Sequence, residues 1–290
     1  MCVIWGIPYL FIRVAVGELS PPTLVFFRTS AAALILLPFA FSRGGLAAIR
    51  GKWIPLLFFT AVEVAVPWLL LSSAEQHITS ALAGLLISAV PLVSVVIATA
   101  LGSREHLGLA TLSGLVVGLA GVALIVGFDV RASDPAALLE MAGVVIGYSL
   151  GPAILSRYLT GVPSVTVNGL ALALCAVAHA PVAAFHWPHA FPSLAVLASV
   201  AVLAVVCTAL AFLLFFPLIA EIGPVRATVI TYVNPAVAAL LGVVVLHESL
   251  TLGMGVGFVL VLAGSVFSTR RRRVSKGLRP AAEAQPGEAL

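Results

Sequence analysis

Charged side chains are scarce in this chain. Asp, Glu, Lys and Arg together make up 9% of its 290 residues, whereas soluble domains contain about 25%. Hydrophobic residues account for 61%, and the mean hydropathy is +1.18. A soluble globule of this length needs more charge to cover its surface. The composition therefore excludes a soluble protein and predicts an integral membrane protein.

Motifs for binding a cofactor are also missing. The three cysteines, Cys2, Cys175 and Cys207, lie in apolar stretches without metal-ligand spacing, which predicts free thiols and neither a metal site nor a disulfide. A zinc motif of the form HExxH begins at His247 but fails at Thr251, where the second histidine is needed. The sequence has no glycine-rich nucleotide loop, which excludes ATP hydrolysis. We expect no cofactor and no metal.

Ten apolar runs approach the length of about 20 residues that a helix needs to cross a bilayer. We place them at Met1–Val16, Pro22–Phe41, Trp53–Ser73, Ile78–Leu101, Gly108–Phe128, Ala136–Arg157, Pro163–Phe185, Leu194–Ile219, Val225–Leu246 and Leu252–Ser268. The first run is short at its cytoplasmic end, which leaves open whether the natural chain starts upstream of Met1. The pattern predicts an all-α integral membrane fold with ten transmembrane helices.

Lysine and arginine predict the orientation, because positively charged loops resist translocation. With the N-terminus inside, the cytoplasmic loops contain Arg43, Arg50, Lys52, Arg104 and Arg157, and the outer loops contain only Arg131. The tail at residues 270–290 begins with the basic residues Arg270, Arg271, Arg272, Arg273, Lys276 and Arg279. We expect both termini in the cytoplasm, with the basic segment on anionic lipid headgroups and its Pro- and Ala-rich end disordered. Nothing in this pattern favours nucleic-acid binding.

Matching residues recur at an offset of 143 positions. The pairs are Trp5 and Tyr148, Pro38 and Pro181, Glu105 and Glu248, Leu107 and Leu250, Gly114 and Gly257, and Gly121 and Gly264, while Pro91 falls one residue off Pro235. This spacing predicts a duplication, with five helices at residues 1–128 and five at residues 136–269. Because five is odd, the second repeat enters the membrane inverted. Inverted repeats typically place a binding site near the bilayer midplane and transport by alternating access.

Three stretches resemble the EamA-domain permeases of the drug/metabolite transporter superfamily. They are WGIPYLFIRVAVGELSPPTLVFFRTSAAALILLP, PWLLLSSAEQHITSALAGLLISAVPLV and YVNPAVAALLGVVVLHESLTLGMGVGFVLVLAGSVF. The most specific part is the last, where Asn234 and Pro235 precede Glu248, and Gly257 and Gly264 follow. The resemblance covers nearly the whole chain. It implies a ten-helix permease with two EamA repeats and cytoplasmic termini that moves small metabolites across the plasma membrane.

Ionisable residues inside the apolar runs are site candidates, because a charge in the bilayer is costly unless it faces the bundle interior or water. Glu63 lies near the middle of the third run, and Arg13 and Arg28 lie at similar depths in the first and second. In one hypothesis Glu63 pairs with an arginine, or binds a substrate ammonium or a coupling proton, while the other arginine holds a substrate carboxylate. In the alternative, the arginines reach outward to headgroups and Glu63 is a buried, hydrogen-bonded or protonated carboxyl. In the second repeat, Arg13 corresponds to Ser156, Arg28 to Ala171 and Glu63 to Val206.

Aromatic residues suggest a second group of candidates. Trp5 and Tyr148 occupy matching positions, and Tyr9 lies one turn after Trp5. These side chains either line a cavity, where stacking or cation-π contacts suit an amino-acid-like solute, or serve as interfacial anchors. Trp68, near the end of the third run, is predicted to be an anchor.

Prolines within two runs complete the candidate set. Tyr232 and Asn234 come just before Pro235, and Pro91 lies at the matching place in the first repeat. A proline removes a main-chain hydrogen bond and can leave a carbonyl facing a cavity. We predict kinks at Pro91 and Pro235, which are either packing features or hinges for a rocking motion.

Small residues predict close packing of the fifth and tenth runs. Their ridges contain Gly114, Gly118 and Gly121, and Gly253, Gly257 and Gly264. Glu105 and Glu248 precede these runs, and we predict that each carboxylate stabilises the N-terminus of the helix that follows.

These observations favour a secondary transporter in the plasma (inner) membrane. The resemblance favours a small metabolite such as an amino acid or a related compound as the solute, and we expect transport that is coupled to protons or another ion, driven by exchange, or facilitated. An intramembrane enzyme and a channel or receptor are the alternatives, and the chain lacks the Ser/His or paired-acid constellation that the enzyme needs. The sequence leaves the substrate, the direction of transport and the oligomeric state open.

Overall fold

The structure is a computed structural model that describes residues 1–42, 45–100, 109–127, 134–222 and 229–269. Across these residues every regular element is a helix. Six helices are long and apolar enough to cross a membrane, and they cover Pro21–Phe41, Trp53–Ala74, Ser80–Ala100, Pro135–Tyr158, Ser164–Phe185 and Leu194–Phe215. Four shorter apolar helices cover Cys2–Ala15, Thr111–Gly127, Val233–Leu246 and Leu252–Phe267. The described residues confirm the all-helical fold and fit a membrane protein, and each predicted apolar run overlaps one of these helices.

The elements follow one another along the chain with short connections. They are α1 (Cys2–Gly6), α2 (Pro8–Ala15), α3 (Pro21–Ser42), α4 (Gly45–Ala48), α5 (Trp53–Phe59), η1 (Thr60–Ala65), α6 (Val66–Ala74), α7 (Ser80–Ile87), α8 (Val90–Ala100), α9 (Leu109–Gly127), α10 (Pro135–Tyr158), α11 (Ser164–Phe185), α12 (Leu194–Ala201), η2 (Val202–Leu210), α13 (Ala211–Ile222), α15 (Val229–Leu246) and α16 (Leu252–Thr269). Several predicted features lie outside the described residues, namely the tail at 270–290, Arg43, Arg104, Glu105 and Arg131.

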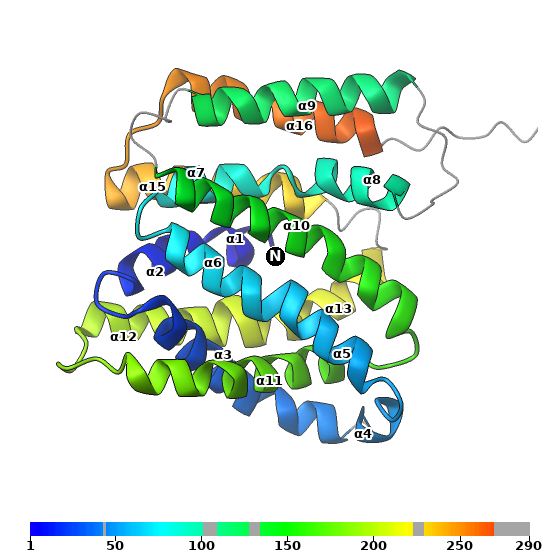
Figure 1. Cartoon of the computed structure of the whole chain (residues 1–290), viewed down its shortest axis with the longest axis vertical. Helices are drawn as coiled ribbons and strands as arrows, with labels where there is room; N and C mark the ends of the chain where they lie inside the picture. The colour runs from blue at the N-terminus through cyan, green and yellow to red at the C-terminus, as the bar shows by residue number, and fades with distance from the viewer. Residues whose placement is uncertain (43–44, 101–108, 128–133, 223–228, 270–290) are drawn as a thin grey trace, which may run out of the picture.

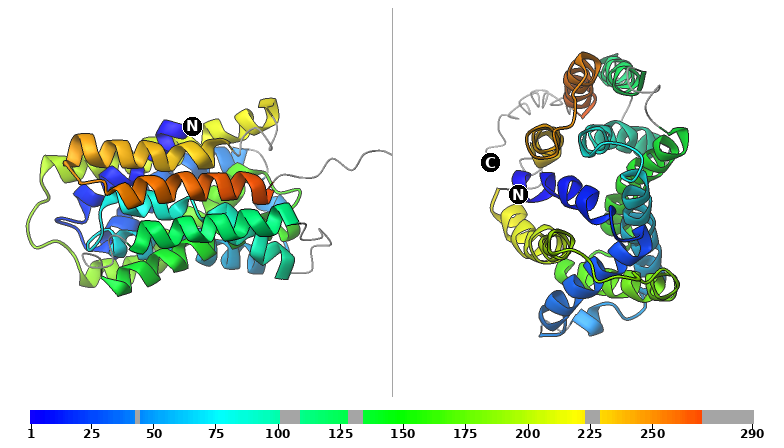
Figure 2. Two further views of the ribbon diagram at one scale, coloured as in Figure 1. Left: turned by 90° about the horizontal axis from the view of Figure 1, so that it is seen from above. Right: turned by 90° about the vertical axis from the view of Figure 1, so that its left-hand side faces the viewer.

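The helices form a bundle whose long elements run roughly parallel to one another (Figure 1). The connections at residues 16–20, 75–79, 186–193 and 247–251 gather at the left-hand end of Figure 1. Helices α1 and α2 lie in the middle of the bundle, as the end-on view in Figure 2 shows, and Met1 lies partway along its length. Helices α9 and α16 form an outlying pair on one side.

Two of the helical spans contain a stretch of π-helix at corresponding places. Element η1 connects α5 to α6, and η2 connects α12 to α13. At the offset of 143 positions, Thr60 corresponds to Leu203 and Ala65 to Thr208, so the two stretches overlap. Such wide turns are rare in α-helices and are frequent at functional sites. The candidate residue Glu63 lies in η1.

The two prolines predicted to kink their helices lie in different local structures. Ahead of Pro91 the chain leaves the α-helical pattern, because the main-chain N–H groups of Ser88 and Ala89 bond to carbonyls only three residues earlier. Pro91 then lies in the first turn of α8, where a proline is tolerated. Pro235 instead lies inside α15, which is one continuous helix. Of these two prolines, Pro91 follows an interruption of the α-helix, and Pro235 does not.

Helices α9 and α16 pack through the predicted glycines. A Cβ atom added to Gly121 would lie 2.6 Å from the main-chain oxygen of Gly257, and one added to Gly264 would lie 2.5 Å from that of Gly114. Because residue 121 contacts 257 while 114 contacts 264, the two helices run antiparallel. The offset of 143 positions relates the two contacts to each other. Gly114 corresponds to Gly257 and Gly121 to Gly264, so the contact between residues 121 and 257 corresponds to the contact between residues 264 and 114.

Adding a methyl group at Gly257 should therefore destabilise the protein. In Gly257→Ala the new Cβ would lie 2.6 Å from the oxygen of Gly121 and 2.9 Å from the nitrogen of Ile125, both main-chain atoms that cannot rotate away. Overpacking of this kind costs about 1–3 kcal/mol. The measurement is the apparent unfolding temperature of the purified protein. Gly255→Ala on the same helix is the matched control, because its Cβ meets open space. Equal stability of the two variants would show that the glycines do not hold the pair together.

Glu248 stabilises a helix N-terminus, although not the one predicted. Its carboxylate accepts hydrogen bonds from the main-chain N–H groups of Ser80 and Ala81, each at 2.9 Å, and from Ser80 Oγ at 3.0 Å. These groups begin α7, whereas α16 is capped by Thr251, whose Oγ1 accepts from the N–H of Met254. The prediction that Glu248 serves the helix following it is thus corrected. The side chain turns back across the bundle because the chain reverses at His247, whose φ is +56°.

Candidate functional site

Arg28 is the central cation of the candidate site. It lies on α3 with only 7% of its surface exposed. Its Nε donates a hydrogen bond to Thr208 Oγ1 at 3.0 Å, and Thr208 Oγ1 donates to the carbonyl oxygen of Leu203 at 2.7 Å. Because a hydroxyl has a single proton, Thr208 can serve Arg28 only as an acceptor, which suits an N–H donor. The π-helical turn of η2 makes this possible, since Leu203 lies five residues before Thr208.

Trp68 fixes the plane of the guanidinium. Arg28 Cζ lies 3.7 Å from the centroid of the Trp68 ring, which is a cation-π contact. Trp68 is only 8% exposed, so it does not serve as the predicted interfacial anchor. Within the described part of the chain, no hydrogen bond joins the two terminal nitrogens of Arg28 to the protein. Those N–H groups form a planar fork of the kind that binds a carboxylate.

Two phenols, the buried Tyr9 and the half-buried Tyr148, lie near this arginine. Tyr9 on α2 interacts electrostatically with Tyr148 on α10 and with Arg28. Tyr148 also interacts with Arg28, Glu63 and Glu75, and its side chain meets that of Trp68. The structure therefore brings Tyr9 and Tyr148 to one place, as the cavity hypothesis expects.

Trp5 lies elsewhere. Its ring contacts Phe212 and Phe215 on α13, with centroids 6.3 and 4.5 Å apart. Close by, α1 approaches α15, where a Cβ on Gly6 would lie 3.1 Å from the carbonyl oxygen of Asn234. The side chain of Tyr232 lies outside the described residues. Trp5 and Asn234 thus belong to the contacts of α1.

Glu63 faces α10 and not an arginine. Its side chain lies against Gly151, where an added Cβ would be 2.6 Å from Glu63 Cδ. The buried oxygen Oε2 has no hydrogen-bond partner among the residues that the structure describes. The hypothesis that Glu63 pairs with Arg13 or Arg28 is not supported, because Arg28 turns to Thr208 and Trp68, and Arg13 donates to the main-chain oxygen of Glu75. Glu63 remains within electrostatic range of Tyr148.

Glu75 is a buried acid that the sequence analysis missed. It caps the C-terminus of α6 and has 0% of its surface exposed. Within the described ranges, neither of its carboxylate oxygens has a hydrogen-bond partner. The sequence signal was weak, because Glu75 ends an apolar run inside the polar stretch Ser72–His77 and reads as part of a loop. The structure places Arg13, Arg28, Tyr9 and Tyr148 around it.

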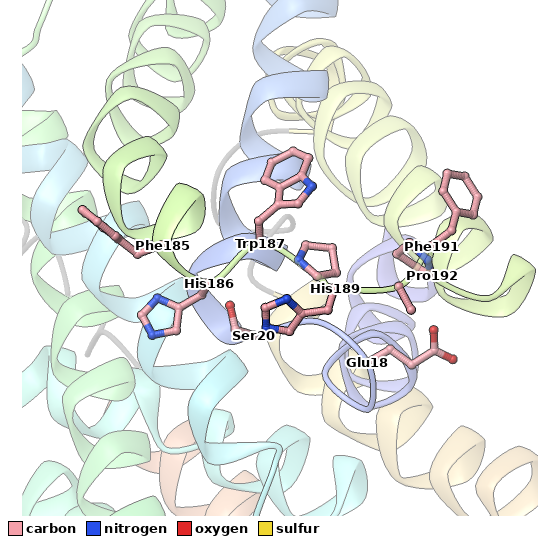
Figure 3. Close-up of a pocket in the computed structure, with 10 residues that line it drawn as sticks. Glu18, Ser20, Phe185, His186, Trp187, His189, Phe191 and Pro192 are labelled. Carbon is pink, nitrogen blue, oxygen red and sulfur yellow. The ribbon is translucent and has the colours of Figure 1, made fainter.

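Two pockets open around the connection between α11 and α12, and Figure 3 shows one of them. Their volumes are about 560 and 620 Å³, and Trp187, His189 and Phe191 line both. Hydrogen bonds from Ser193 lower the pKa of the Glu18 carboxyl at the rim. None of the predicted site residues lines either pocket. The buried charges are the stronger candidates, because a charge inside an apolar bundle needs a function or a partner.

Known proteins share this sequence pattern. The profile of the EamA-like transporter family matches residues 1–127 and again residues 136–270. The chain belongs to the EamA-like transporter family. Its members are membrane transporters, so this family member is a transporter that acts on a small-molecule solute.

Individual relatives agree with the family assignment. The chain is 28% identical over 248 residues to the uncharacterized inner membrane transporter YedA of Escherichia coli K12, covering 83% of this chain and 78% of YedA. The YedA proteins of Escherichia coli O6:H1 and O157:H7 match equally well. A solved structure described only as a crystal structure of protein is 23% identical, with a TM-score of 0.67, and the likeness covers 92% of this chain and 94% of that one. This last likeness shows the fold alone.

Proposed function

We propose that this EamA-family member is a secondary transporter of amino acids or related zwitterionic metabolites in the inner membrane. It works by alternating access between two inverted repeats of five helices, at residues 1–128 and 136–269, with both termini in the cytoplasm. The observation that carries the proposal is the buried Arg28, held between Trp68 and Thr208 with its terminal N–H groups facing no protein acceptor in the described part of the chain.

Arg28, Thr208, Trp68, Glu63, Tyr9 and Tyr148 are called the Arg28 cluster here, and their chemistry favours a zwitterion. Arg28 offers a guanidinium fork to a carboxylate, and Glu63 offers an acceptor without a partner to an ammonium group. Tyr148 lies within electrostatic range of both residues and links them. Trp68 and the phenols supply apolar faces for the remainder of the solute. The cluster contains one cation and one anion suited to the two charged ends of an amino acid.

The repeat arrangement is supported by three observations. The family profile matches the two halves separately. The glycine contacts between α9 and α16 exchange under the offset of 143 positions. The π-helical stretches η1 and η2 overlap under the same offset. Glu63 in η1 belongs to the first proposed repeat and Thr208 in η2 to the second, which supports a solute site between the two halves, as expected for inverted-repeat transporters.

Transport by the purified protein tests the proposal. The protein is reconstituted into liposomes, and entry of a radiolabelled mixture of the standard amino acids is followed with and without a pH gradient. We expect saturable flux that is absent from protein-free liposomes. A radiolabelled mixture of sugars serves as the comparison, because a sugar has neither a carboxylate for Arg28 nor an ammonium for Glu63. Absence of amino acid flux in either direction under every gradient would remove the proposal.

A further inference from the structure

Glu75 stands out among the charged residues of the bundle. The residue is completely buried, and both carboxylate oxygens lack hydrogen-bond donors in the described part of the chain. A buried carboxylate without partners costs several kcal/mol of solvation. Buried polar groups in native proteins almost always have a partner, so the exceptions need an explanation. A carboxyl that takes up a proton loses its charge and this cost.

The neighbouring residues give Glu75 a means of releasing that proton. Arg13 donates a hydrogen bond to the main-chain oxygen of Glu75 and leaves the carboxylate oxygens free. Its positive charge therefore favours the ionised form of Glu75 without bonding to it. The other charged or titratable groups that face Glu75 are Tyr9 on α2, Arg28 on α3, Tyr148 on α10 and Glu248 after α15. Glu140 on α10 accepts a hydrogen bond from nearby Ser73.

This position differs from that of Glu63. Glu63 lies on η1 against α10, whereas Glu75 lies twelve residues later in the chain at the C-terminus of α6. Glu75 interacts electrostatically with Arg28 and with Glu248, whereas the side chain of Glu63 lies against Gly151 on α10. A proton can therefore bind at Glu75 while a solute ammonium group occupies Glu63.

We propose that Glu75 binds the proton that couples the transport cycle to the pH gradient. This proposal rests on the proposed transport function. In each cycle the carboxylate takes one proton from water on one side of the membrane and returns it to water on the other. Arg28 and Glu63 bind the solute, and Glu75 couples its movement to the proton gradient, which sets the direction of net flux. The guanidinium of Arg13 stabilises the ionised form after the proton leaves.

Infrared spectroscopy tests the proton site without any solute. Difference spectra of the purified protein between acidic and alkaline buffer should contain the carbonyl stretch of a protonated carboxyl that Glu75→Gln removes. Glutamine has the size of a protonated glutamic acid, so the variant is expected to fold. Glu18→Gln, at an exposed acid, is the control and should leave that band in place. An unchanged band in Glu75→Gln would overturn the proposal, whatever the transport assay gives.

The flux assay tests the coupling. A gradient of one pH unit supports accumulation of up to about tenfold for a one-to-one cycle. In Glu75→Gln, the accumulation of radiolabelled amino acids against their gradient should disappear, while exchange of labelled for unlabelled amino acids continues. Accumulation equal to that of the unmodified protein would overturn the proposal, and so would loss of exchange in a folded variant. If no amino acid moves at all, the transport proposal fails, and the infrared result alone decides whether Glu75 binds a proton.

Discussion

Replacing Arg28 by glutamine should nearly abolish amino acid transport. The guanidinium is buried, its Nε is bound to Thr208, and its plane rests on Trp68, so the terminal N–H groups are already oriented before a solute arrives. Truncating one partner of a buried charge pair costs about 2–5 kcal/mol. That loss weakens binding by a factor of about 30 or more. The measurement is the concentration of amino acid that gives half-maximal uptake into liposomes.

Two further variants separate charge from geometry at Arg28. Arg28→Lys keeps the positive charge but loses the planar fork and the stacking on Trp68, so its uptake should fall between those of Arg28→Gln and the unmodified protein. Arg157→Gln is the matched control, because Arg157 is an exposed arginine at the end of α10, 5.6 Å from the ring of Tyr158. If Arg28→Gln and Arg157→Gln had equal uptake, Arg28 would not bind the solute.

The fold was accessible from the sequence because the membrane constrains it strongly. In a bilayer the main chain must satisfy its own hydrogen bonds, so a long apolar run has few alternatives to a helix. Each predicted run accordingly overlaps an apolar helix in the described part of the chain. The close helix packing at Gly121 and Gly257 could be predicted for a related reason, since helices approach closely only where side chains are small. These features depend on local composition and not on distant partners.

The site was accessible only in part. Arg28 and Glu63 stood out as charges inside apolar runs, but their partners come from helices far away in the chain. Hydropathy cannot show that Arg28 meets Thr208, which is 180 residues away. Nor does composition show a π-helical turn, because η2 is a run of mostly apolar residues like the helices that flank it. The pairing of Glu63 with an arginine was a guess from charge alone, and packing against Gly151 replaced it.

Residues at the ends of helices were the hardest to interpret. Glu75 resembles a loop residue in sequence, yet it is completely buried because α2, α3 and α10 surround the end of α6. Trp68 has the position of an interfacial anchor, but the arginine that covers it belongs to another helix. Glu248 precedes α16 and instead caps α7. In each case a neighbouring element decides the role, and one sequence does not show which elements are neighbours.

A methyl group at Gly151 should impair transport without removing any charged residue. In Gly151→Ala the new Cβ would overlap Glu63 Oε2 and lie 2.6 Å from Glu63 Cδ and 2.9 Å from Glu63 Cβ. Rotating the carboxylate relieves the first two contacts but not the third, so Glu63 must move away from α10 and from Tyr148. If Glu63 binds the solute ammonium group, this displacement weakens uptake as Glu63→Gln does, by about tenfold or more for a lost charged hydrogen bond of about 1.5–3 kcal/mol.

Gly143→Ala provides the comparison that isolates Glu63. Gly143 lies on the same helix, and its added Cβ would meet only Leu70 Cδ1 at 2.8 Å, the end of a side chain that can rotate. Both substitutions raise the intrinsic helix propensity of α10 by about 1 kcal/mol, so a change in helix stability affects them alike. Uptake should therefore fall in Gly151→Ala and stay near that of the unmodified protein in Gly143→Ala. Unimpaired uptake in both Gly151→Ala and Glu63→Gln would mean that Glu63 is a buried carboxyl outside the transport path, and Arg28 would then have to recognise the solute without it.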